Sequence, residues 1–102
     1  MAQKIVWTSA AVEDLQSIFN FIARDSEENA ASAIGQIMDS VELVSEFPFI
    51  GRIVPEYDEV TVRETIVYSY RVVYHVRPGL ITVVGVIHGA RRLKRALKGR
   101  DV

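Results

Sequence analysis

Two arginines and one histidine lie near the ends of predicted strands in the second half of the chain, where they could act on a phosphate. Arg71 lies near the start of one strand, His88 ends the next, and Arg91 follows shortly afterwards. Arginine presents a planar, permanently charged fork that suits phosphate oxygens, and histidine can move a proton near neutral pH. Cleavage of RNA without a metal needs a base, an acid and cations for the charged transition state. These residues could supply part of such a site, although a lone histidine at a strand end more often has a structural role.

Other kinds of catalytic or cofactor site match the sequence poorly. The chain contains no cysteine and only two histidines, and the histidines are not joined by clustered carboxylates. Thiolate metal sites and disulfides are therefore excluded. The P-loop, the dinucleotide-binding glycine pattern and the nucleophile-elbow motif do not occur. We expect neither a metal nor another cofactor.

Length and composition predict a single globular domain over residues 1–102. Hydrophobic residues make up 49% of the chain and charged residues 25%, which is an ordinary balance for such a domain. The longest apolar run, residues 80–87, is far shorter than the roughly 20 residues of a membrane-spanning helix. The stretch before Trp7 is too short for a signal peptide. We therefore expect a cytoplasmic protein with no membrane association.

The net charge of -1 conceals an uneven distribution. Most acidic residues lie between Glu13 and Glu59, whereas half of the basic residues lie near the C-terminus. This basic run consists of Arg91, Arg92, Lys94, Arg95, Lys98 and Arg100. It is either a solvated tail or a surface for an anionic partner, such as nucleic acid or an acidic protein.

The elements that position these residues follow from hydrophobic periodicity. Residues 4–7 predict a short strand, and residues 8–24 and 26–46 predict two helices capped by Thr8 or Ser9 and by Ser26. The very short connection between the helices predicts an antiparallel hairpin. Pro48 ends the second helix, and residues 47–59 predict an ordered loop. Three strands then follow over residues 62–67, 70–76 and 80–88, with a turn at Pro78 and Gly79.

The last hairpin divides the sheet into two faces if Arg77 pairs with Leu80. Arg71 then lies opposite Val86, and His75 lies opposite Thr82. One face is apolar enough to be covered by the helices, and it would carry Tyr70, Val72, Tyr74, Val76, Ile81, Val83 and Ile87. The other face would carry Arg71, Val73, His75, Thr82, Val84, Val86 and His88. Its valines have no obvious cover, which is typical of a partner surface, a homodimer interface or a face closed by the C-terminal segment.

The same patterns predict the hydrophobic core. The residues expected in it are Trp7, Leu15, Phe19, Ile22, Ile37, Val41, Val72, Tyr74, Val83 and Ile87. The predicted fold class is α+β, with the order β-α-α-β-β-β, a helix hairpin packed on a small antiparallel sheet and a short C-terminal helix.

Five short motifs in this order resemble the toxins of the RelE/ParE superfamily, in its ParE-like branch. They are V-W-T-S-A-A-V-E-D-L at residues 6–15, F-P-F-I-G-R at 47–52, V-R-E at 62–64, Y-R-V-V-Y at 70–74 and H-G-A-R at 88–91. Each motif is weak alone, but together they span nearly the whole chain. The resemblance implies a helical hairpin on a small antiparallel sheet, which agrees with the order read from the residues.

The resemblance also implies two functions of different class. RelE-like toxins cleave messenger RNA on the ribosome, and Arg71 and Arg91 match their catalytic arginines. Arg63 and Thr65, however, stand where those enzymes tend to carry paired lysines, and Leu97 stands about where a tyrosine is expected. ParE-like toxins instead poison DNA gyrase, and the long helices and the F-P-x-x-G-R loop favour that branch. We therefore expect a gyrase-directed toxin without catalytic residues, with a ribosome-dependent ribonuclease using Arg71, His88 and Arg91 as the alternative. A module with little toxicity is a third reading.

The implied partners are a cognate antitoxin and DNA gyrase, or the ribosome and messenger RNA in the alternative. We expect the antitoxin to contact Arg71, Val73, Val84, Val86 and Arg91. We expect the gyrase-directed surface to consist of Arg91, Arg92, Lys94, Arg95 and Lys98. A heterotetramer or a larger toxin–antitoxin complex is compatible with the resemblance.

Overall fold

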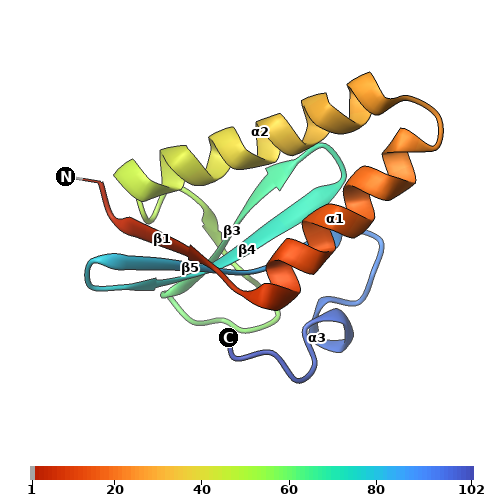
Figure 1. The fold of residues 1–102 in the computed structure, drawn as a ribbon. Coiled ribbons are helices and arrows are strands. Elements are labelled where there is room, and N and C mark those ends of the chain that lie inside the picture. The colour runs from red at the N-terminus through yellow and green to blue at the C-terminus, as the bar shows by residue number, and fades with distance from the viewer. Residues whose placement is uncertain (1) are drawn as a thin grey trace.

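Two antiparallel helices lie across one face of a five-stranded sheet, and a short third helix lies on the other side (Figure 1). The computed structural model describes residues 2–102. The elements in chain order are β1 (Lys4–Trp7), α1 (Ser9–Ala23), α2 (Glu27–Glu46), β2 (Arg52–Ile53), β3 (Val62–Val67), β4 (Tyr70–Arg77), β5 (Leu80–His88) and α3 (Leu93–Ala96). The predicted α+β class, the helix hairpin and the short C-terminal helix are confirmed. Residues 47–59, predicted as a loop, contain the two-residue strand β2 as well.

Side-chain caps start both long helices where the sequence predicted them. The Thr8 hydroxyl accepts a hydrogen bond from the Ala11 N–H at 3.1 Å, and the Ser26 hydroxyl accepts one from the Asn29 N–H at 3.1 Å. Each bond satisfies a backbone donor that the first helical turn leaves without a partner. The buried apolar residues of α2 are Ala30, Ala33, Ile37, Val41 and Val44, and they include Ile37 and Val41, the two residues of this helix expected in the core.

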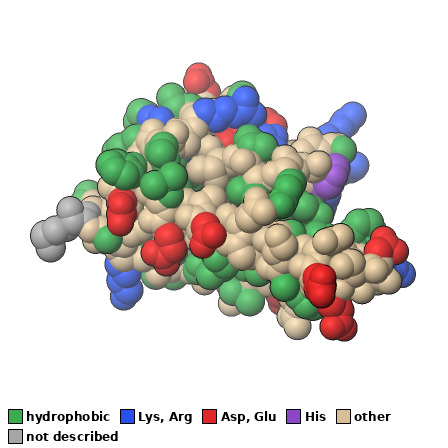
Figure 2. All heavy atoms as spheres, turned by 90° about the horizontal axis from the view of Figure 1, so that it is seen from above, with side chains coloured by type: hydrophobic (Ala, Val, Ile, Leu, Met, Phe, Trp, Pro, Cys, Tyr) green, Lys and Arg blue, Asp and Glu red, His purple; other side chains and the backbone are tan. Residues whose placement is uncertain are grey.

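The buried stripe of α1 is rotated from the prediction. Ala11 and Ile18 are its buried residues, and Leu15 and Ile22 pack partly against the same core. Phe19 is 36% exposed, so its assignment to the core is wrong. Apolar side chains consequently remain on the outer surface of the helical layer, which Figure 2 shows from above.

The sheet has the order β1-β5-β4-β3-β2 and is mixed. The β5-β4-β3-β2 part is antiparallel, but β1 runs parallel to β5, with Lys4 opposite Leu80. The expectation of a wholly antiparallel sheet is therefore wrong for this edge. Parallel neighbours need a long connection between them, and all the elements from α1 to β4 provide it.

A β-bulge in the last hairpin changes which face its final residues occupy. Arg77 pairs with Leu80 and His75 with Thr82, as predicted. The register then shifts between Val73 and Tyr74, so that Arg71 lies opposite Ile87 rather than Val86. A bulge adds one residue to one strand and turns the following side chains to the opposite faces. Val86 therefore packs under the helices and Ile87 packs on the other side of the sheet, the reverse of the prediction.

The second face of the sheet is a second core, not an open surface. It contains Val54, Val62, Val73, Val84, Ile87, Leu93 and Leu97, all buried. The last two belong to the C-terminal segment, which packs back over the sheet. The predicted accessibility of this face is therefore wrong, and the alternative of a C-terminal segment that folds back is confirmed. Within residues 2–102, no helix has the length and apolar character to cross a membrane.

Candidate functional site

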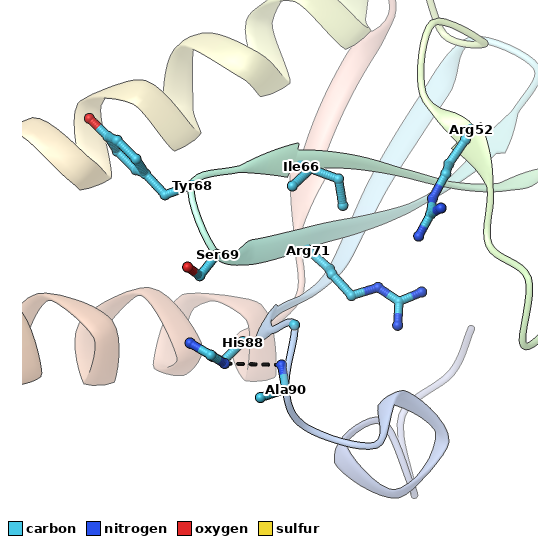
Figure 3. Close-up of a pocket in the computed structure, with 8 residues that line it drawn as sticks. Arg52, Ile66, Tyr68, Ser69, Arg71, His88 and Ala90 are labelled. Carbon is cyan, nitrogen blue, oxygen red and sulfur yellow. Dashed lines mark hydrogen bonds between the residues drawn. The ribbon is translucent and has the colours of Figure 1, made fainter.

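A shallow hollow lies where the β3–β4 turn meets the end of β5 and the strand β2 (Figure 3). We call it the arginine hollow, and the residues that line it are Arg52, Ile66, Tyr68, Ser69, Arg71, His88, Gly89 and Ala90. It brings together Arg71 and His88, two of the residues predicted to do chemistry. Arg91, the third, is exposed and is not among the lining residues.

Two carboxylates pair with the guanidinium group of Arg71. Its Nη1 and Nη2 donate to the two carboxylate oxygens of Glu56, each at 2.7 Å. Its Nε and Nη2 donate to Glu64 at 2.5 and 3.0 Å. The Glu64 side chain has no exposed surface, and it also accepts from Nε of Arg52 at 2.7 Å. Arg71 is thus held on both sides by acids of the same chain.

The pairing shifts the pKa values of both Glu56 and Arg71. The hydrogen bond from Arg71 lowers the pKa of Glu56 from 4.5 to about 2, while partial burial opposes that shift. The hydrogen bonds from Glu56 and Glu64 raise the pKa of Arg71 above its usual value. Arg71 therefore stays charged, but its charge is balanced inside the protein. A phosphate could bind it only after a carboxylate had moved away.

The side chains of His88 and Arg71 do not converge on one position where both could contact the same phosphate. Figure 3 shows their side chains pointing away from each other. Nδ1 of His88 accepts a hydrogen bond from the Ala90 N–H at 3.1 Å, and its ring packs edge-on against Tyr70 at 5.6 Å. These contacts fit the structural role that the sequence left open. Within the described residues 2–102, no three His, Asp or Glu side chains are grouped closely enough to hold a metal ion.

The valines predicted to contact the antitoxin are buried in the free chain. Val73 and Val84 have no exposed surface, and Val86 is 3% exposed. Val73 and Val84 lie beneath the C-terminal segment, whereas the bulge directs Val86 into the core under the helices. A partner could reach Val73 and Val84 only by displacing that segment.

The C-terminal segment is fixed by apolar and ionic contacts together. Its Leu93 and Leu97 side chains are buried against the sheet. Arg100 donates from both terminal nitrogens to Asp14 of α1, at 2.6 and 3.0 Å, and to the Val84 carbonyl at 3.0 Å. Because α3 turns these residues inward, the remaining basic side chains face solvent. Arg91, Arg92, Lys94, Arg95 and Lys98 are all exposed.

The F-P-F-I-G-R motif forms a loop fixed to the sheet by a buried tyrosine. The Tyr74 hydroxyl donates to the Pro48 carbonyl at 2.9 Å and accepts from the Gly51 N–H at 3.1 Å. A side chain at position 51 would collide with the Glu64 backbone, where the nearest atom would lie at 2.5 Å. The glycine thus lets β2 approach β3 closely and places Arg52 beside Glu64.

Sequence reasoning missed the acidic partners Glu56, Glu64 and Asp14. A signal for Glu64 was present, since a two-residue turn at Tyr68 and Ser69 places Glu64 on the same face as Arg71. A carboxylate on the buried side of a strand needs a cationic partner. Glu56 and Asp14 carried no comparable signal because a loop and the chain end bring their partners to them.

Comparisons with known proteins agree with this fold. The family model described as the ParE toxin of the type II toxin–antitoxin system parDE matches residues 5–93. The protein named Toxin RelE2 from Caulobacter vibrioides is 33% identical over 92 residues, which cover 89% of this chain and 99% of that protein. A solved structure described as the chromosomal ParDE TA system from P. aeruginosa has a TM-score of 0.70 at 19% identity and covers 85% of this chain and 96% of that chain. That last likeness concerns the fold. The match to the family model and the identity to the Caulobacter toxin show that the chain belongs to the ParE toxin family of type II toxin–antitoxin systems.

Proposed function

We propose that this toxin inhibits DNA gyrase and that a cognate antitoxin neutralises it. The observation that carries the proposal is the state of Arg71. Its guanidinium group is paired with Glu56 and with the fully buried Glu64, so it is not free to bind a phosphate. The resemblance to ParE-like toxins, which poison gyrase, supplies the target. Gyrase acts on chromosomal and plasmid DNA, so the expected place of action is the cytoplasm.

Several groups that a metal-free ribonuclease needs are either engaged in other contacts or lie outside the arginine hollow. His88 is engaged with the Ala90 N–H, Arg91 does not line the hollow, and no tyrosine follows it. Loss of one general acid or base costs roughly 10²- to 10⁴-fold in rate. A site that lacks several such groups would have little activity.

Ribosome-dependent cleavage of messenger RNA is the second candidate. The observation that favours it is the 33% identity to a protein named Toxin RelE2. In this reading Arg71, His88 and Arg91 contact the messenger, and Glu56 leaves Arg71 when the toxin binds its target. Glu56 lies on an exposed loop, and its side chain is 34% exposed.

The exposed basic residues of the C-terminal segment are the proposed target surface. Arg91, Arg92, Lys94, Arg95 and Lys98 project from a segment that the apolar contacts of Leu93 and Leu97 hold in place. Cations on a fixed support attract an anionic partner, such as DNA bound to gyrase, without the cost of ordering a flexible tail.

Two assays on the purified toxin decide between the candidates. In the first, supercoiling of a relaxed plasmid by gyrase is followed as toxin is added. In the second, a defined messenger is mapped for cuts on translating ribosomes. We expect inhibition of supercoiling and no cuts. Ribosome-dependent cuts that disappear in the His88→Ala and Arg91→Ala variants would establish the ribonuclease. These two exposed residues are preferred to Arg71, whose removal would leave the buried Glu64 with one cation fewer.

A further inference from the structure

Strand β3 is covered along only part of its outer edge. β2 pairs with it at two positions, Arg52 with Glu64 and Ile53 with Arg63. Continuation of this register would place Ile50 opposite Ile66. The chain turns away instead, because the Ile50 N–H donates to the Phe47 carbonyl at 3.0 Å. The edge is therefore open from Thr65 to the end of β3.

The backbone of Ile66 faces this open edge. The Val62 carbonyl accepts from Val54 on the β2 side at 3.0 Å, whereas the Thr61 carbonyl accepts from Val76 on the β4 side at 2.8 Å. Backbone direction alternates along a strand, so Ile66, like Val62, directs its N–H and C=O toward the β2 side. Within residues 2–102 neither group of Ile66 has a backbone partner there. Exposed edges of this kind readily pair with another strand.

The open edge forms the floor of an apolar groove below α2. We call it the β3-edge groove, and it is lined by Ser40, Leu43, Ile50, Gly51, Arg52, Glu64, Thr65 and Ile66. Its three large apolar side chains are half exposed: Leu43 by 47%, Ile50 by 53% and Ile66 by 54%. They come from a helix, a loop and a strand that converge on one place. An extended segment lying on the edge would cover all three.

One end of the groove carries an exposed cationic side chain. The groove shares Arg52 and Ile66 with the arginine hollow, so the two depressions adjoin each other. The Arg52 side chain is 60% exposed at that junction. Nε of Arg52 pairs with Glu64, whereas its terminal nitrogens form no hydrogen bond within residues 2–102, so they are free to pair with an acidic residue of a bound segment.

We infer that the β3-edge groove binds an extended segment of the cognate antitoxin, which adds a strand to β3 at Ile66. The inference rests on the proposed neutralisation by an antitoxin and names its surface. An apolar side chain of the segment lies between Leu43 and Ile50, and an acidic residue lies toward Arg52. Strand addition of this kind takes affinity from main-chain hydrogen bonds and specificity from side-chain pockets. The surface is accessible in the free toxin and does not require displacement of the C-terminal segment.

Two variants and one matched control test the groove in a titration with the protein encoded by the reading frame beside the toxin gene. Ile66→Pro removes the N–H that faces the open edge, but the bonds of Thr65 and Val67 to β4 remain, and proline is tolerated on such an edge. Leu43→Glu places a charge in the groove. Met38→Glu is the control, because Met38 is on the same helix, is 41% exposed and does not line the groove. We expect the first two to weaken binding roughly ten- to a hundredfold and the control to change it less than about twofold.

Hydrogen exchange of the backbone amides measures directly whether the antitoxin segment pairs with the Ile66 backbone. The Ile66 amide should exchange fast in the free toxin and slowly in the complex, whereas Thr65 and Val67, whose amides face β4, should be protected in both. An Ile66 amide that exchanges at the same rate in both states, or full binding by both groove variants, would overturn the inference.

Supercoiling assays separate this inference from the proposed function. Without antitoxin, Leu43→Glu, which lies outside the arginine hollow, should inhibit gyrase as the wild type does, but the antitoxin should relieve the inhibition less. If the wild-type toxin does not inhibit gyrase, the proposed target is wrong. The binding and exchange measurements still test whether the β3-edge groove binds the antitoxin.

Discussion

At the scale of single residues, buried polar side chains fix the loops around the arginine hollow. The Tyr74 ring is 1% exposed, and its hydroxyl serves both the Pro48 carbonyl and the Gly51 N–H. Burial also raises the pKa of Tyr74, so the hydroxyl stays protonated and can donate. Tyr74→Phe should lower the free energy of unfolding by about 1–3 kcal/mol, because it leaves buried groups without a partner. Urea denaturation measures this, and Tyr70→Phe is the control, expected within about 0.5 kcal/mol of the wild type.

The Glu56–Arg71 pair predicts an acid-dependent part of the stability. The pKa of Glu56 is about 2 in the folded protein against 4.5 for the ordinary group. Because the folded-state pKa is depressed, the stabilisation is complete above about pH 4.5 and is lost as the pH falls toward 2. Glu56→Gln removes this dependence, so the difference in unfolding midpoint between wild type and variant should shrink between these pH values. A difference that stays constant from pH 6 to pH 2 would show that Glu56 is not paired in solution.

At the scale of elements, a glycine in β5 sets how closely the C-terminal segment approaches the sheet. A Cβ at Gly85 would lie 2.7 Å from Cδ2 of Leu97 and 2.9 Å from Nη1 of Arg100. Both atoms are at the ends of flexible side chains, so Gly85→Ala should loosen the segment but leave the sheet intact. We expect a cost of about 1–3 kcal/mol and faster amide exchange confined to residues 89–102. Gly35→Ala is the control, since a Cβ there meets nothing within 4 Å and should stabilise α2 by roughly 1 kcal/mol.

The same elements show how far the sequence could predict the structure. Caps, apolar stripes and the Pro78–Gly79 turn located both long helices and the three long strands, because these signals are local. The bulge opposite Val73 has no local signal of comparable strength, and it reversed the faces of Val86 and Ile87. The pairing of β1 with β5 and the placement of Glu56 against Arg71 join distant parts of the chain. One sequence carries no signal for such contacts.

At the scale of the whole molecule, the basic C-terminal segment has two roles on two sides. Its inner side covers the second core through Leu93 and Leu97, and Arg100 joins it to α1. Truncation after Arg92, which would be harmless if the segment were a solvated tail, should therefore expose Val73, Val84 and Ile87 and destabilise the fold. Its outer side carries exposed cations that make few contacts, such as Lys94, which lies 5.4 Å from the centre of the Tyr57 ring.

Charge removal on the outer side separates these roles. Arg92, Arg95 and Lys98 are exposed and form no salt bridge within residues 2–102. A triple change of these residues to glutamine keeps Leu93, Leu97 and Arg100, so thermal unfolding should stay within about 0.5 kcal/mol of the wild type. Inhibition of gyrase should weaken, and the wild type should lose more of its inhibition than the variant as salt is raised, because screening acts on the charges that the variant lacks. The control is Arg24→Gln with Arg77→Gln, exposed arginines outside the segment. Equal inhibition by the triple variant and the wild type at every salt concentration would place the target surface elsewhere on the toxin.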